Sequence, residues 1–154
     1  MDLSRISRDD WNVAGIAFLL VIDLLFLPWL SASANIGAVS ISASSTATGV
    51  PDGWLGVIAV LAAVAIIVDL AIERFGSSSL PAIGGSRART RVILTAILVL
   101  CLALKFLLHV RLTVDFWGFG FWAAVALTVA LVIVALRAQR AEALVGGSRF
   151  SARR

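Results

Sequence analysis

Four long apolar runs alternate with short polar segments along this 154-residue chain. The runs cover residues 11–30, 53–72, 92–110 and 118–136. A helix of about twenty residues is about 30 Å long, which matches the hydrocarbon core of a bilayer. We therefore expect an all-α membrane protein with one domain over residues 1–154. Its fold is expected to be an antiparallel bundle of four transmembrane helices in up-down-up-down order.

The composition agrees with a chain that lies in a membrane. Hydrophobic residues make up 60% of the sequence and charged residues 14%, and the mean hydropathy is +1.02. Soluble domains contain about 45–50% apolar and about 25% charged residues. The net charge of +4 does not indicate a nucleic-acid partner, because the arginines flank the apolar runs and no nucleic-acid motif is present.

The arginines predict the orientation of the four runs. Two precede the first run, four lie between the second and third, and five follow the fourth, whereas Arg111 stands on the opposite side. Cytoplasmic segments of membrane proteins are rich in arginine and lysine, so both termini, the loop 73–91 and the basic tail 137–154 are expected in the cytoplasm. We expect these segments to bind anionic lipid headgroups. The pair Gly146–Gly147 is expected to break the tail helix.

The first run leads into an external segment, residues 31–52, in which the residues up to Pro51 are uncharged. Trp11 and Trp29 are expected to mark the two membrane interfaces of this run, and Pro28 to bend or end its helix. Apolar and polar residues partly alternate between Ile36 and Ile41, which favours either a short β-hairpin packed over the helix ends or a flexible loop. A cleavable signal peptide is a weaker interpretation, because the run is longer than a usual signal and contains a central acid.

Two opposite charges lie inside apolar runs at similar depth. Asp23 is about 18 Å along the first run from Trp11, and Lys105 is about 20 Å along the third run from Val92. Unpaired charges in hydrocarbon are unfavourable by several kcal/mol. We therefore expect an ion pair between Asp23 and Lys105, unless the lysine extends along its stem to the interface instead.

His109 and Cys101 share a helix face with Lys105, one turn to either side of it. The histidine could extend a polar track from Asp23 and Lys105 to the outer surface, or bind a loop carbonyl as a neutral interfacial residue. Cys101 is expected to be a small buried apolar residue. With one histidine, one cysteine and no triad or metal-ligand spacing, we expect no enzyme activity, no metal and no cofactor.

Two further sets of residues are expected to have structural roles. Charges at the inner interface are expected near the end of the second run, with Asp69 paired either to Arg74 or to a basic residue of the following loop. These charges are Asp69, Glu73 and Arg74. A stripe of small residues on the second run is expected to let helices approach closely. It consists of Gly56, Ala59 and Ala63.

Five segments carry a resemblance that covers nearly the whole chain. They are IDLLFLPWLS (22–31), PDGWLGVIAVLA (51–62), VDLAIERF (68–75), LPAIGGSRARTR (80–91) and LKFLLHV (104–110). They resemble segments of small, uncharacterised four-span membrane proteins of actinobacteria, a group with no assigned activity. The resemblance implies a multi-pass protein of the bacterial plasma membrane and no particular chemistry.

Two functions remain open at this point. One is a small non-enzymatic structural or accessory membrane protein, which acts through helix–helix association with itself or with a larger membrane complex. The alternative is a subunit of a small transporter or proton-coupled channel that uses Asp23, Lys105 and His109 as a relay. A dry, internally satisfied environment around these charges favours the first function, and a watery path favours the second.

Overall fold

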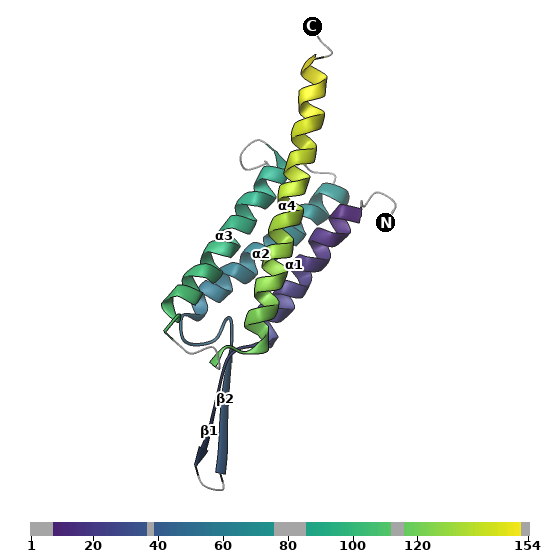
Figure 1. Cartoon of the computed structure of the whole chain (residues 1–154). Coiled ribbons are helices and arrows are strands. Elements are labelled where there is room, and N and C mark those ends of the chain that lie inside the picture. Colours follow the sequence, from purple (N-terminus) through teal and green to yellow (C-terminus); the bar gives the residue numbers. More distant parts are fainter. Residues whose placement is uncertain (1–7, 37–38, 76–85, 112–115, 152–154) are drawn as a thin grey trace.

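The computed structural model describes residues 8–36, 39–75, 86–111 and 116–151. Four helices and one two-stranded sheet make up this part of the chain (Figure 1). In chain order the elements are α1 (Arg8–Phe26), β1 (Pro28–Ile36), β2 (Val39–Thr46), α2 (Gly53–Phe75), α3 (Arg87–Leu108) and α4 (Phe119–Ser151). Three of the helices are long and apolar enough to cross a membrane: α2, α3 and the Phe119–Ala141 part of α4.

The four helices lie side by side and form what we call the helical body (Figure 1). Helix α1 packs against α2 and α4, and α3 packs against the same two helices. Leucines and isoleucines with less than 2% exposure fill the centre, among them Leu20, Leu55, Leu98 and Leu131, one from each helix. Helices that follow one another in the chain run in opposite directions. The start of α1, the end of α2 and the start of α3 therefore lie at the same end of the helical body, and α4 continues beyond them there (Figure 1).

The first apolar run ends as a helix earlier than expected. Helix α1 stops at Phe26, and Pro28 begins β1 instead of lying in the last helical turn. Proline lacks the backbone N–H of a helical residue, and its ring disfavours a helical conformation in the preceding residue. Trp29 is therefore not an interfacial residue: it is 1% exposed and belongs to the core.

Of the two structures considered for the external segment, the structure has the β-hairpin. Strands β1 and β2 pair antiparallel from Pro28 opposite Thr46 to Ile36 opposite Val39. The hairpin is not packed over the helix ends, because it projects away from the helical body along the direction of the helices (Figure 1). At its base, Gly118 N–H donates to the Trp29 carbonyl at 2.9 Å, and Leu30 forms a β-bridge with Trp117.

Helix α4 differs from the expected tail. It continues through Gly146 and Gly147 to Ser151 and extends beyond the other helices (Figure 1). Each glycine destabilises a helix by only about 1 kcal/mol relative to alanine, and the neighbouring alanines and arginines are good helix formers. Helix α3 begins before the expected residue 92, because the Ser86 side chain accepts a hydrogen bond from Arg89 N–H and caps it.

Candidate functional site

Lys105 is the most deeply buried cation of the described residues, and it binds backbone rather than a carboxylate. It lies in the last turn of α3 and is 2% exposed. Its Nζ donates to the carbonyl of Ala47 at 2.5 Å and to the carbonyl of Gly49 at 3.3 Å. Both carbonyls belong to the strap, our name for residues 47–52 between β2 and α2. The ammonium therefore fastens the strap to α3.

The strap approaches α2 so closely that only glycine fits beneath it. A Cβ on Gly53 would collide with the Thr48 carbonyl, and a Cβ on Gly56 would collide with the Ala47 carbonyl. Gly56, which the sequence placed in a stripe for helix packing, therefore contacts the strap. Ala59 and Ala63 are 0% exposed and lie in the core of the helical body, as a packing stripe requires.

His109 and Asp52 complete the polar surroundings of the strap. His109 Nδ1 lies 2.9 Å from the carbonyl of Lys105, so the histidine interacts with its own helix and not with a loop carbonyl. Its Nε2 is 3.8 Å from Asp52 Oδ2. Asp52 has a positive φ of 54°, which turns the chain from the strap into α2. The histidine thus joins the end of α3 to the start of α2.

The structure does not form the expected ion pair between Asp23 and Lys105. Asp23 is 2% exposed, and its Oδ2 accepts a hydrogen bond from Trp29 Nε1 at 3.4 Å. Its Oδ1 has no hydrogen-bond partner. The physical reason is that the strap supplies two carbonyls to the ammonium, while the indole supplies a donor to the carboxyl group. Lys105 therefore binds the external segment, and Asp23 binds Trp29, which was expected at the membrane interface.

Trp29 reaches Asp23 because β1 is irregular at its base. Pro28 pairs with Thr46 and Leu30 pairs with Ser45, so Trp29 is an extra residue in the ladder. Such a bulge bends the strand and redirects a side chain. The indole enters the helical body and contacts Phe121 edge to face, with ring centroids 5.6 Å apart.

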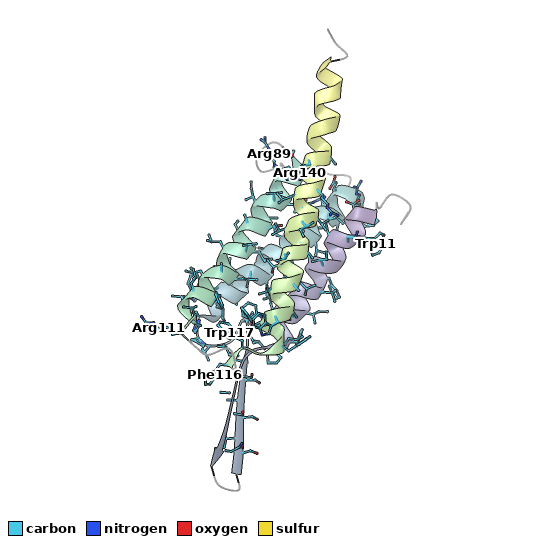
Figure 2. All side chains as sticks on the ribbon, viewed as in Figure 1. Trp11, Arg89, Arg111, Phe116, Trp117 and Arg140 are labelled. Atoms are coloured by element: carbon cyan, nitrogen blue, oxygen red, sulfur yellow. The ribbon has the colours of Figure 1, made fainter. Side chains whose placement is uncertain are left out.

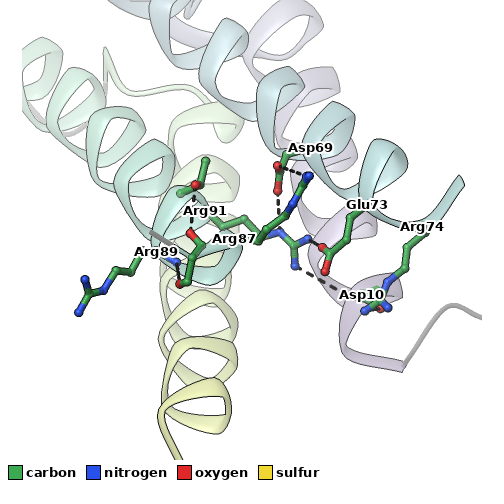
Figure 3. A network of polar contacts seen from close by, with 9 residues as sticks. Asp10, Asp69, Glu73, Arg74, Arg87, Arg89 and Arg91 are labelled. Atoms are coloured by element: carbon green, nitrogen blue, oxygen red, sulfur yellow. Dashed lines mark hydrogen bonds and ion pairs between the residues drawn. The ribbon is translucent and has the colours of Figure 1, made fainter. Parts of the chain in front are cut away.

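A network of ion pairs joins three helices at the opposite end (Figure 3). Arg91 on α3 is 7% exposed; its Nε lies 3.1 Å from Asp69, and its NH2 group contacts Glu73, both on α2. Arg87 also binds Asp69, at 3.0 Å. Asp69 was expected to pair either with Arg74 or with a basic residue of the loop that follows. The structure has the second alternative, with Arg87 and Arg91 as the partners.

Arg74 has a partner that the sequence analysis did not identify. Its guanidinium lies 2.5 Å from Asp10 of α1, and Arg91 extends the network to the same carboxylate at 3.9 Å. Asp10 is 5% exposed. An acidic residue in the first turn of a helix is usually explained by the helix dipole, so sequence alone gave no signal for this contact between helices.

Cys101 and the metal-ligating side chains are the remaining groups considered above. Cys101 is 8% exposed and lies in the core. Within the described ranges, no group of three or more His, Cys, Asp or Glu side chains could hold a metal ion.

Comparison with known proteins gives no family for this chain. No protein-family model matches it, and no curated protein or solved structure matches it significantly. The resemblance to actinobacterial four-span proteins therefore stays a prediction.

Proposed function

We propose that this chain is a small, non-enzymatic structural or accessory protein of the bacterial plasma membrane, which acts by associating with itself or with a larger membrane complex. In this proposal all four helices cross the bilayer. Large apolar side chains face outward on every helix: Phe18 is 58% exposed, Leu61 61%, Leu100 68% and Val129 55%. An apolar perimeter of this kind suits contact with lipid or with other transmembrane helices.

Helix α1 is proposed as the fourth span, in addition to the three helices that are long and apolar enough to cross a membrane. Its 19 residues are about 28 Å long, which is close to the thickness of the hydrocarbon core. Asp23, the acidic residue in the interior of this helix, is buried and contacts Trp29. Its N-terminal acid, Asp10, is paired with Arg74 at the end of the helical body.

The proposed orientation places the termini and the ion-pair network in the cytoplasm. Arg89 and Arg140 lie at the end of the molecule that carries the termini, and Arg111 lies at the hairpin end (Figure 2). This distribution supports the positive-inside orientation, with the hairpin outside. Exposed arginines at the inner end would bind anionic lipid headgroups.

The binding of Lys105 to the strap is the observation that carries the proposal. A transport relay needs charged groups that exchange with water or with a moving ion. Lys105 is instead enclosed, and its ammonium is held by two backbone carbonyls of the chain itself. Asp23 is enclosed to the same degree beside Trp29. Both groups maintain the architecture of the helical body, which is the behaviour expected of a structural protein.

The unpartnered Oδ1 of Asp23 is the one feature that favours the alternative, a proton-coupled channel subunit. Proton flux into liposomes tests the two functions against each other. The purified chain, Asp23→Asn and His109→Gln are reconstituted separately, and an entrapped pH-sensitive dye reports flux under an imposed gradient. We expect all three samples to match protein-free liposomes. Flux in the wild type that Asp23→Asn abolishes would overturn the proposal.

A further inference from the structure

The hairpin has one apolar face and one serine face. In an antiparallel pair, directly opposite residues share a face and successive residues alternate between faces. Ala32 lies opposite Ala43, and Ser33 lies opposite Ser42. The apolar face contains Leu30, Ala32, Ile41 and Ala43, and Ser45 lies on the same face at its base, opposite Leu30. The serine face contains Ser31, Ser33, Asn35, Ser40, Ser42 and Ser44.

The apolar face has no covering element in the described part of the chain. Ala32 and Ala43 are exposed, and Ile41 is 56% exposed. The sheet contains two strands, so each strand has one edge without a partner strand, apart from the bridge between Leu30 and Trp117 at the base of β1. Two-stranded hairpins on their own are at best marginally stable in water. A nine-residue strand extends about 30 Å, too far for its base at Trp117 and Gly118 to support its whole length.

The absence of charge in the hairpin limits the kind of partner that can bind the apolar face. No charged residue lies between Asp23 and Asp52. Natural edge strands usually avoid self-association with charged side chains, and this hairpin has none. A charged partner would find no complementary charge here, whereas a second copy meets no electrostatic repulsion. The small alanines also allow two sheets to approach closely.

The membrane supplies the symmetry for such a contact. Copies with the same topology carry their hairpins on the same side of the bilayer and at the same height. A two-fold axis along the membrane normal is parallel to the strands, because the hairpin projects along the helix direction (Figure 1). Rotation about this axis turns the apolar face of one copy onto the apolar face of the other, which is an isologous interface.

We propose that the apolar face of the hairpin docks against the same face of a second copy and forms a small two-sheet dimer contact outside the membrane. The proposal rests on the proposed membrane function and names the partner in that association. Two strands about 5 Å apart and about 30 Å long present about 300 Å² per copy. Stable soluble dimers bury about 800 Å² per partner. The contact therefore depends on the high effective concentration that anchoring in one membrane provides.

Disulfide trapping tests this contact with a matched control. Cys101 is the only cysteine, so Cys101→Ser gives a cysteine-free background. Ala43→Cys then places a thiol on the apolar face, and Ser42→Cys places one on the serine face, one residue away along the same strand. Both variants are oxidised in liposomes, and covalent dimer is followed on denaturing gels. We expect Ala43→Cys to form dimer at least tenfold faster than Ser42→Cys.

Two results would overturn the inference. Equal rates, or faster trapping of Ser42→Cys, would show random collision or contact through the serine face. In native membranes, trapping of Ala43→Cys to a protein of another size would identify a different partner. Circular dichroism of each variant verifies that the helices are intact before the rates are compared.

A parallel measurement separates this inference from the proposed function. The mass of the wild-type chain is measured in nanodiscs, together with Ile41→Ser, which makes the apolar face polar. We expect the wild type to be dimeric and Ile41→Ser to shift toward monomer. If Ile41→Ser stays fully dimeric, the hairpin contact is wrong, while association through the helices still stands. Proton flux that Asp23→Asn abolishes would instead overturn the function and leave the hairpin result to be judged on its own.

Discussion

A double-mutant cycle on Asp23 and Lys105 tests the central feature of this structure, the separate anchoring of the two buried charges. Lys105→Met removes both hydrogen bonds from the ammonium to the strap and leaves the Ala47 and Gly49 carbonyls without their donor. Hydrogen bonds to charged groups contribute about 1.5–3 kcal/mol each. The desolvation of a buried charge offsets part of this gain. We expect a net loss of about 2–3 kcal/mol in the free energy of unfolding.

Asp23→Asn has a smaller expected effect, because the asparagine side-chain oxygen can still accept the hydrogen bond from Trp29 Nε1. We expect a change of less than about 1 kcal/mol. Asp23 and Lys105 have no partner in common, and such changes usually add to within about 0.5 kcal/mol. The double mutant should therefore show the sum of the two single effects.

The assay is reversible unfolding in mixed micelles, titrated with a denaturing detergent and followed by circular dichroism and tryptophan fluorescence. Leu107→Met is the matched control: it lies on the same helix, is 62% exposed, and should change the unfolding free energy by less than about 0.5 kcal/mol. A coupling energy above about 1 kcal/mol, with the double mutant more stable than either single mutant, would refute the reasoning. That result would indicate a direct ion pair between the two residues.

Two further pairs of variants test the strap and the ion-pair network. Gly56→Ala should destabilise the protein by about 1–3 kcal/mol, because the new methyl group meets the Ala47 carbonyl, whereas Gly15→Ala should stabilise α1 by about 0.5–1 kcal/mol, because nothing lies within 4 Å of its Cβ position. Arg91→Gln should destabilise by about 1–3 kcal/mol, because Asp69 and Asp10 each lose one of their two cations and keep the other, Arg87 and Arg74 respectively. Arg89→Gln, at an exposed side chain of the same helix, should change stability by less than about 0.5 kcal/mol.

The same unfolding assay measures all four variants. Equal effects of the two glycine changes would contradict the close contact between the strap and α2. An Arg91 variant as stable as the Arg89 variant would show that the network contributes little to holding the three helices together.

The helices could be predicted from sequence because their signals are local. Runs of about twenty apolar residues and flanking arginines depend on residues close together in the chain. The predicted runs therefore overlap all four helices. The end of α1 was expected too late, because the apolar run was extended past Pro28, a residue that cannot continue a helix.

The partners of the buried polar groups could not be predicted in this way. Hydropathy and helix rise gave Asp23 and Lys105 similar depths, and electrostatics then favoured pairing them. The strap and the bulge at Trp29 supply competing partners, and neither has a pattern that identifies its position in space. Asp10 illustrates the same limit, because its contact with Arg74 joins residues from two different helices.

By itself, the sequence determined the apolar helices, their approximate bounds and the charge difference between the two ends, since each depends on nearby residues and on transfer into an apolar medium. The tertiary structure alone decided which group satisfies each buried charge. It also decided whether segment 31–52 is a hairpin or a loop, and where that hairpin points. These outcomes depend on backbone carbonyls and side chains that approach one another only after the helices have packed, so no local pattern encodes them.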